Sequence, residues 1–440
     1  MTPVSPFVFC FIQLIPFLVF WWIAKRLKIN FELGLGLLLC LYFVYNIFVP
    51  IVDHQLGIHS FFGYSVPIQF ILHLQQASVY ALGLFSLLGG YLLCRFWLVG
   101  KKDDQIPSQS IQAQIPRIMV VLQTTIWGLI IFNVNQSGIS LFRIFDLSNQ
   151  NESEILFSVD WKYPVVDLLS NCLPVCLFLQ FRFSQKIDWK WIVLFCLWLI
   201  ISLLTGWRYR IILFSLIIGL HFLINQKVSV YKYMLVLLSA ALVFSWLTLN
   251  RMAIAKRQFD LITFNISKFD IQIFTNEFSN SRTFRASQIY LAENPQMQKL
   301  GYSSWIHFIS NKFKPKSNFP NQERPKPWIL KVTKAWIPAG WLWNPNPAVT
   351  QMEEFFLTFN WLGLLAGMCF VGFWAGFLDS RVSDPLFQSF KIIGIALLFQ
   401  WTTRGFFLYQ IQITIVCFLP FLLLWLAKPY LSRGTTSNKA

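Results

Sequence analysis

Runs of about 20 apolar residues recur along this chain, and a helix of that length crosses a hydrocarbon core roughly 30 Å thick. Of its 440 residues, 56% are hydrophobic, 18% aromatic and 12% charged. This composition lies far outside that of soluble domains. Because hydrocarbon offers no hydrogen bonds to the backbone, each run has to satisfy its own peptide groups as a helix. The sequence therefore predicts an all-α polytopic integral membrane protein.

We expect about 11 transmembrane helices, with very short turns between the paired spans near Arg208 and Arg404. One long interruption separates an N-terminal transmembrane bundle of about eight helices, residues 1–250, from about three C-terminal helices and a tail, residues 351–440. The interruption itself, residues 251–350, is predicted to be one large loop. The predicted spans are 5–24, 31–52, 70–96, 117–135, 164–183, 189–204, 209–224, 232–250, 352–377, 388–403 and 405–427.

Loops rich in Lys and Arg predict the orientation of the chain, because such loops stay on the cytoplasmic side. They alternate with loops poor in these residues, which predicts an external N-terminus, a cytoplasmic C-terminus and an external loop 251–350. The first apolar segment has no charged start and no cleavage site, so we expect it to be retained as a helix. The basic loops hold Lys25, Arg26 and Lys28; Lys101 and Lys102; Arg182, Lys186 and Lys190; Lys227 and Lys232; Arg381; and Lys428, Arg433 and Lys439.

The large external loop is strongly basic, with 14 Lys and Arg against 5 Asp and Glu. This excess favours an anionic partner such as a diphosphate or an acidic glycan, and an idle solvated surface is the alternative. A helix is expected from about Arg282 to Glu293, where Asn294-Pro295 ends it. Residues 312–347, rich in Pro, Trp and Lys, are expected to form a loop without helices. No nucleic-acid partner is expected.

Several common chemistries leave no trace in the sequence. It has no phosphate-binding Walker loop, no GxSxG or HExxH motif and no Asp-x-Asp pair, and its eight cysteines lie in or beside apolar spans without metal-ligand spacing. We therefore expect no cofactor and no metal. A reaction here would use a substrate that is already activated, and a lipid diphosphate is such a substrate when cations neutralise the developing charge.

Arginines at span ends are the first candidates for that task, since a guanidinium is a permanent charge that matches phosphate oxygens. Arg208 and Arg210 should point to different faces of one helix, and Arg208 is favoured because Gly206 allows close approach of a ligand. Arg404 is the second candidate and Arg251 the weaker third. The alternative for all of them is that they extend toward lipid headgroups.

Two adjacent glutamates, Glu353 and Glu354, are the candidates for a general base. A partly desolvated carboxylate would have a raised affinity for protons and could accept one from a sugar hydroxyl. Capping of the following helix is the alternative explanation. His307 is the one histidine of the large loop, and Asp53 and His54 lie in another external connection; their roles stay open.

With these residues in place, the chain resembles bacterial O-antigen polymerases of the Wzy type, also called oligosaccharide repeat unit polymerases. The similarity covers most of the chain, in that many spans are followed by one long external loop. Trp207 departs from the pattern, because members often have a small or polar residue there. The motifs are Thr205-Gly206-Trp207-Arg208; Gly301-Tyr302-Ser303 and Lys314-Pro315; Ala348-Val349-Thr350 through Glu353-Glu354-Phe355-Phe356 to Phe359-Asn360-Trp361-Leu362-Gly363; and Arg404-Gly405-Phe406.

The resemblance implies a multi-pass protein of the bacterial plasma (inner) membrane that joins oligosaccharide units on the external face without metal or nucleotide. It implies that Arg208 and Arg404 hold two undecaprenyl diphosphates, with Arg210 and Arg251 as substitutes. Glu353 or Glu354 would activate the acceptor hydroxyl. The basic loop, with Lys314 and His307, would bind the glycan. Membrane lipids, a chain-length regulator and a flippase are the implied partners.

Two other readings stay open. An O-antigen ligase has the same layout, but it transfers a finished chain and generally relies on a histidine in the large loop, for which only His307 is available. A transporter or lipid-oligosaccharide flippase performs no chemistry; a flippase should carry charges deep within several spans, and transporters often have broken helices in two similar halves. Here the charges gather at span ends and in one loop, which favours chemistry at the membrane surface.

Overall fold

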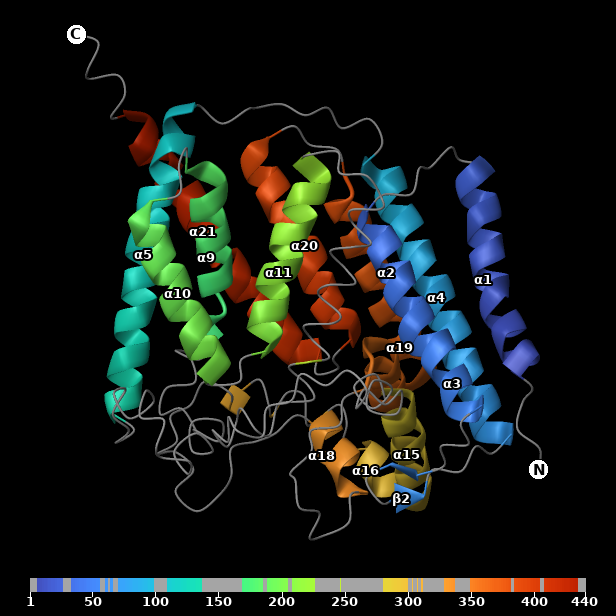
Figure 1. The fold of residues 1–440 in the computed structure, drawn as a ribbon. Helices are drawn as coiled ribbons and strands as arrows, with labels where there is room; N and C mark the ends of the chain where they lie inside the picture. Colours follow the sequence, from blue (N-terminus) through green and yellow to red (C-terminus); the bar gives the residue numbers. More distant parts are fainter. Residues whose placement is uncertain are drawn as a thin grey trace.

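A computed structural model of the chain describes a bundle of long helices with a small group of shorter helices at one end (Figure 1). The only strands among the described residues are β1 (Ser60–Phe61) and β2 (Tyr64–Ser65), which form an antiparallel pair. The described residues are 6–26, 33–55, 60–61, 64–65, 70–98, 109–136, 168–184, 188–204, 208–225, 246, 280–299, 303, 307, 310–311, 328–336, 349–380, 384–403 and 407–433.

Six of the described helical segments are long and apolar enough to cross a membrane. The predicted multi-pass membrane architecture is confirmed to this extent, and the predicted span 232–250 lies outside the described residues apart from Trp246. Three shorter apolar helices, α9 (Leu173–Phe183), α10 (Trp189–Leu204) and α11 (Arg208–Asn225), lie among them. The six are α1 (Pro6–Arg26), the rod formed by α2 (Leu33–Phe43), η1 (Val44–Phe48) and α3 (Val49–Gln55), α4 (Phe70–Leu98), α5 (Gln109–Gln136), α19 (Gln351–Leu378) and α21 (Phe407–Arg433).

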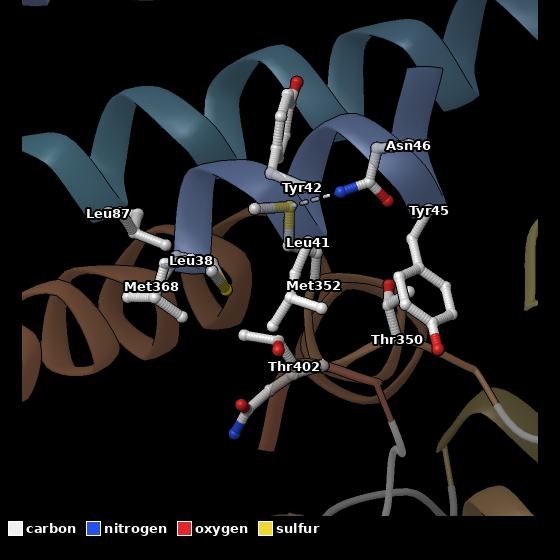
Figure 2. Close-up of a pocket in the computed structure, with 11 residues that line it drawn as sticks. Leu38, Leu41, Tyr42, Tyr45, Asn46, Leu87, Thr350, Met352, Met368 and Thr402 are labelled. Atoms are coloured by element: carbon white, nitrogen blue, oxygen red, sulfur yellow. Dashed lines mark hydrogen bonds between the residues drawn. The ribbon is translucent and has the colours of Figure 1, made fainter. Parts of the chain in front are cut away.

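The second of these segments, the rod α2–η1–α3, contains one turn of π-helix. Pro50 has no N–H to donate to the carbonyl four residues back, and the Val49 N–H bonds Val44 O, five residues back. The wider turn places Tyr45 and Asn46 beside α19, where the Asn46 amide lies 3.9 Å from the sulfur of Met352 (Figure 2).

The opposite end of the rod is fixed by a buried carboxylate at the end of α19. Asp379 accepts hydrogen bonds from the N–H groups of Gly34 and Leu35, at 2.9 and 3.0 Å, and from the Tyr91 hydroxyl at 3.2 Å. These bonds satisfy two of the free N–H groups that begin α2, and they link α2, α4 and α19.

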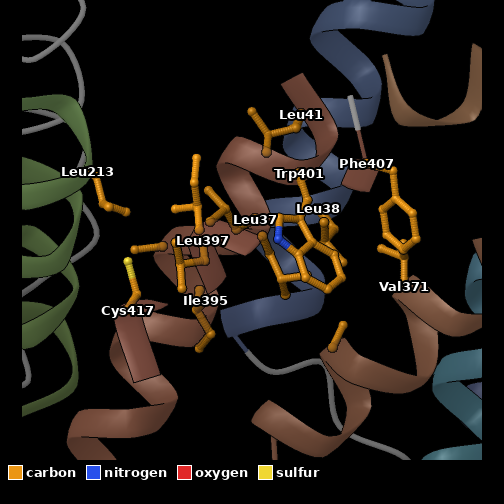
Figure 3. Close-up of a cluster of buried hydrophobic side chains, with 14 of the residues drawn as sticks. Leu37, Leu38, Leu41, Leu213, Val371, Ile395, Leu397, Trp401, Phe407 and Cys417 are labelled. Carbon is orange, nitrogen blue, oxygen red and sulfur yellow. The ribbon is translucent and has the colours of Figure 1, made fainter. Parts of the chain in front are cut away.

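Helix α20 (Pro385–Thr403) lies at the centre of the bundle and contacts α2, α11, α19 and α21. Every residue from Ile392 to Leu398 is buried. Figure 3 shows this core, in which Ile395, Leu397 and Trp401 of α20 lie between side chains of the surrounding helices. Burial on all sides explains why the apolar pattern of α20 has no single preferred face.

Helices α4 and α19 pack with their backbones in contact. A Cβ atom added at Gly90 would lie 2.0 Å from the carbonyl oxygen of Cys369, and one added at Gly372 would lie 1.8 Å from that of Leu87. Small residues permit such an approach, and in lipid close packing replaces the hydrophobic effect as the force between helices. Nearer to Tyr80 and Glu353, a Cβ atom added at Gly83 would lie 2.8 Å from the sulfur of Met352, so the two helices are also closely packed there.

We predict that Gly90→Ala lowers the thermal unfolding midpoint of the purified protein in detergent, because the added methyl group forces α4 and α19 apart. The neighbouring Gly89 has nothing within 4 Å of its added Cβ, so Gly89→Ala is the matched control and should leave the midpoint unchanged or raise it slightly. Equal midpoints for the two variants would contradict the close contact.

Helix α19 is interrupted at Asn360, whose φ of 59° and ψ of −155° are not helical. The segment before the break, Gln351–Thr358, is buried throughout and carries both candidate glutamates. The Asn360 side chain accepts a hydrogen bond from the Trp361 N–H at 3.0 Å, which stabilises the start of the second segment. The break thus separates a short buried helix from the longer second segment of α19.

We predict that Asn360→Gly keeps or raises the unfolding midpoint, whereas Asn360→Val lowers it. Backbone conformations of this kind cost a residue with a Cβ on the order of 1–3 kcal/mol, and β-branched residues tolerate positive φ least. Thermal unfolding of the two variants beside the unchanged protein tests this. A valine variant as stable as the glycine variant would show that the break is absent.

Three short helices lie together at one end of the bundle, near α3, α4 and the start of α19: α15 (Asn280–Glu293), α16 (Pro295–Lys299) and α18 (Trp328–Ala335) (Figure 1). The helix predicted for 282–293 is confirmed, and it stops at Asn294 as expected. The prediction of a loop without helices over 312–347 is wrong at α18. There Trp328, Ile329, Val332 and Trp336 are buried, and they repeat with helical spacing between flanking prolines.

Candidate functional site

A buried ion pair attaches α15 to the bundle. Asp53, at the end of α3, is completely buried, and it accepts a hydrogen bond from Arg282 Nε at 2.9 Å and a second one from Arg282 Nη2. Ser281 lies 3.4 Å from the same carboxylate. A two-pronged contact of this kind between guanidinium and carboxylate is among the strongest hydrogen-bonded pairs in proteins. The role of Asp53, which the sequence left open, is therefore to pair with Arg282.

Arg285 lies one turn further along the same face of α15. Its Nη2 is 3.8 Å from Asp53 Oδ2, and the residue is completely buried. None of its three guanidinium nitrogens has a hydrogen-bond partner among the described residues. Burial lowers the pKa of Arg285 from its ordinary value, while the charges of Asp53, Tyr80 and Glu353 act in the opposite direction. A buried cation with free donors is suited to an anionic oxygen.

Glu353 faces this cluster from α19. It is completely buried; the Tyr80 hydroxyl donates to its Oε1, and the Thr350 N–H donates to its Oε2. The Glu353 N–H in turn reaches the Thr350 hydroxyl at 3.4 Å, which completes a capping box. The capping explanation is therefore confirmed for Glu353, and its carboxylate also lies among the charges around Arg285.

Gln76 and Tyr80 connect α4 to the cluster. The Gln76 amide donates to the Tyr80 hydroxyl at 2.9 Å and to the Ser281 carbonyl at 3.3 Å. A chain of hydrogen bonds thus runs from α15 through α4 to Glu353. Gln76, Tyr80 and Glu353 each have two hydrogen-bond partners in this chain of bonds, which fixes the orientation of the Glu353 carboxylate.

Glu354 holds a different part of the chain. Its Oε2 accepts a hydrogen bond from the Phe407 N–H at 2.7 Å, at the start of α21. Asn280, the first residue of α15, donates to the Thr403 carbonyl at 2.9 Å, at the end of α20. Arg404 lies outside the described residues, but Thr403 and Phe407, the described residues on either side of it, are both fixed to this cluster.

The remaining predicted residues lie elsewhere or are not described. Arg208 begins α11, but its side chain is not among those that the structure describes. Arg251 and Lys314 lie outside the described residues altogether. Arg210 is buried, and its Nε donates to Asn171 at 3.1 Å, where the chain turns before α9. His307 is exposed, and its carbonyl accepts a hydrogen bond from Asn311 at 2.9 Å.

Sequence reasoning missed Arg282, Arg285 and Tyr80. The signal for the arginines was present, because two cations three residues apart in a predicted helix share a face. Their partner was not identifiable, since Asp53 precedes Arg282 by 229 residues.

Comparison of the chain with protein-family models, with curated proteins and with solved structures finds no match.

We predict that Asp53→Asn lowers the stability of the protein by about 3–5 kcal/mol, because it leaves Arg282 buried without its counter-charge. The double variant Asp53→Asn, Arg282→Met should recover part of the loss, since Arg285 is still left without the Asp53 charge. Unfolding in detergent measures both effects, and Glu293→Gln, an exposed change on the same helix, is the control with an effect within about 0.5 kcal/mol. Additive losses in the double variant would contradict the pairing.

Proposed function

We propose that this protein is a membrane glycosyltransferase that polymerises undecaprenyl-diphosphate-linked oligosaccharide repeat units on the external face of a bacterial plasma membrane. One observation supports the proposal above all. Glu353, Glu354, the end of α20 at Thr403, the start of α21 at Phe407 and the basic helix α15 converge at one end of an apolar bundle. These segments carry two of the four motifs on which the family resemblance rests.

In the proposed reaction, a hydroxyl of the acceptor glycan attacks the anomeric carbon of the donor glycan. A new C–O bond forms, and the bond between that carbon and the diphosphate oxygen breaks, which releases undecaprenyl diphosphate with its electron pair. Glu353 accepts the hydroxyl proton. Arg208 and Arg404 neutralise the diphosphates, and Arg285 supplies a further buried cation within reach of the same cluster.

The proposal includes the complete topology: about 11 spans, an external N-terminus, a cytoplasmic C-terminus and the large loop 251–350 facing outward. On that arrangement α15, α16 and α18 belong to the external face. The glycan would enter along the basic surface of this loop, and a flippase and a chain-length regulator would act before and beside the protein. No nucleotide or metal takes part in the proposed step.

The glycan profile of a deletion strain tests the proposal, with lipid-linked intermediates separated by size and by membrane leaflet. We expect long chains to disappear and single repeat units to accumulate on the outer leaflet. Long chains that remain on the carrier would instead identify a ligase. Units trapped on the inner leaflet would identify a flippase, and an unchanged profile would reject a role in glycan assembly.

Complementation of the same strain tests the arginines. Arg208→Ala, Arg404→Ala and Arg285→Met should each reduce polymerisation about 100-fold at normal protein level, as expected when one charge-stabilising group is removed. Glu293→Gln, an exposed change on α15, is the control and should restore full chain length. Normal chains from all three arginine variants would refute the assignment of the site.

A further inference from the structure

The reacting groups of the candidate site are closed off from water in the structure. Glu353 and Arg285 are both 0% exposed, although a sugar hydroxyl would have to contact the first and a diphosphate oxygen the second. The pocket that Thr350 and Gln351 line has room for about one water molecule, so no part of a glycan fits there (Figure 2). The proposed reaction therefore requires a second arrangement of the chain, in which these two groups are uncovered.

Helix α15 covers the site from the end of the bundle, where it lies with α16 and α18 (Figure 1). Its Phe284 packs against both helices that carry the site. The ring of Phe284 lies 6.4 Å from that of Tyr80 on α4 and 6.0 Å from that of Phe356 on α19. A movement of α15 away from the bundle would therefore uncover Glu353 and leave the packing of α4 against α19 in place.

The attachment of α15 to the bundle includes polar contacts that a ligand or water can replace. They are the pair of Arg282 with Asp53 and two hydrogen bonds to backbone carbonyls, those of Ser281 and Thr403. Exchange of such a bond for one to water costs little net free energy, whereas matched helix surfaces in lipid have no such substitute. Helix α15 is thus better suited to separate from the site than α4 or α19.

The ion pair also indicates which ligand would separate them. Asp53 needs Arg282 only while it is buried, because a carboxylate in water is stable without a counter-charge. Arg282 and Arg285 lie on the same face of α15, and the guanidinium nitrogens of Arg285 have no hydrogen-bond partner among the described residues. A diphosphate has several anionic oxygens and could bind both guanidiniums, so it can compete with the single carboxylate.

We propose that α15 is a lid that the Asp53–Arg282 pair holds closed, and that the diphosphate of the lipid carrier opens it by taking Arg282 and Arg285 from Asp53. Asp53 is then an internal competitor of the substrate, and the site is uncovered only when a diphosphate is bound. The inference rests on the proposed function for the nature of this ligand.

The test measures how fast a thiol beneath the lid reacts with a charged methanethiosulfonate reagent, which does not enter hydrocarbon. Ser281→Cys places this thiol next to Asp53, because Ser281 is 0% exposed and its hydroxyl lies 3.4 Å from the carboxylate. We expect farnesyl diphosphate, a short polyprenyl diphosphate, to accelerate labelling of the purified full-length protein in detergent about 10-fold. Farnesol, which has the same chain without the charge, should leave the rate unchanged.

Glu293→Cys is the matched control, since this position is exposed on the same helix. It should react at one rate with and without either compound. Four native cysteines are buried and should stay unlabelled, which distinguishes opening of the lid from unfolding of the protein. They are Cys94, Cys172, Cys176 and Cys417.

Two further changes in the Ser281→Cys protein test the two arginine contacts. Asp53→Asn should raise the labelling rate without any ligand, because the uncharged amide holds Arg282 less tightly. Arg285→Met should abolish the acceleration by farnesyl diphosphate, because the diphosphate loses one of its two cations.

Three results would overturn the lid. A thiol at position 281 that reacts as fast as the one at position 293 without ligand would show that the site is already open. An unchanged or slower reaction with farnesyl diphosphate would show that the diphosphate does not open it. Equal acceleration by farnesol would show that the chain acts and the charge does not.

The lid and the proposed function can fail separately. Loss of long chains in the deletion strain, together with a thiol that does not respond to farnesyl diphosphate, would refute the lid alone. A responding thiol in a protein whose deletion leaves the glycan profile unchanged would refute the polymerase alone.

Discussion

The neutralisation of one buried carboxylate, Asp53, is the condition on which the candidate site depends. A carboxylate without access to water is costly, and here Arg282 compensates for it through two hydrogen bonds. Because Arg282 belongs to α15, the requirement brings that helix against the ends of α3 and α4. Arg285 follows one turn later and lies near the same carboxylate, with its Nη2 at 3.8 Å from Asp53 Oδ2. The pairing of Asp53 with Arg282 therefore also buries Arg285, a second cation whose guanidinium nitrogens have no hydrogen-bond partner among the described residues.

The packing of the membrane helices provides the precision of this arrangement. Tyr80 and Glu353 lie on two helices whose backbones touch at Gly90 and Gly372, and Gly83 packs against Met352 beside the hydrogen bond between Tyr80 and Glu353. In a bilayer the lipid does not drive helices together, and contact of this kind has to come from matching surfaces. The same pair of helices thus carries the tightest packing and the candidate base. Glu354 extends the arrangement to α21 through the Phe407 N–H.

Much of the architecture was predictable, because hydrocarbon imposes a length and a composition on every helix that crosses it. The capping of α19 was also predictable, since Thr350 precedes Glu353 by the spacing of a capping box. Helix α18 was missed because prolines on both sides concealed a short amphipathic pattern. The partners of Asp53 and Glu354 were not predictable, because each contact joins segments far apart in sequence, and no local periodicity encodes such a pairing.

The rod α2–η1–α3 is fixed at both ends, by Asp379 at Gly34 and Leu35 and by Arg282 at Asp53. Each residue of an α-helix advances the side chains by about 100° around the axis. A residue lost from Leu33–Phe43 would therefore turn Asp53 away from Arg282 or pull Gly34 off Asp379. The π-turn is the one place in the rod where the chain already accommodates a surplus residue. A deletion in the rod is thus tolerable only at 44–48. There the loss of one residue would preserve the contacts of Asp379 and Asp53. It would also remove the wide turn on which Asn46 lies.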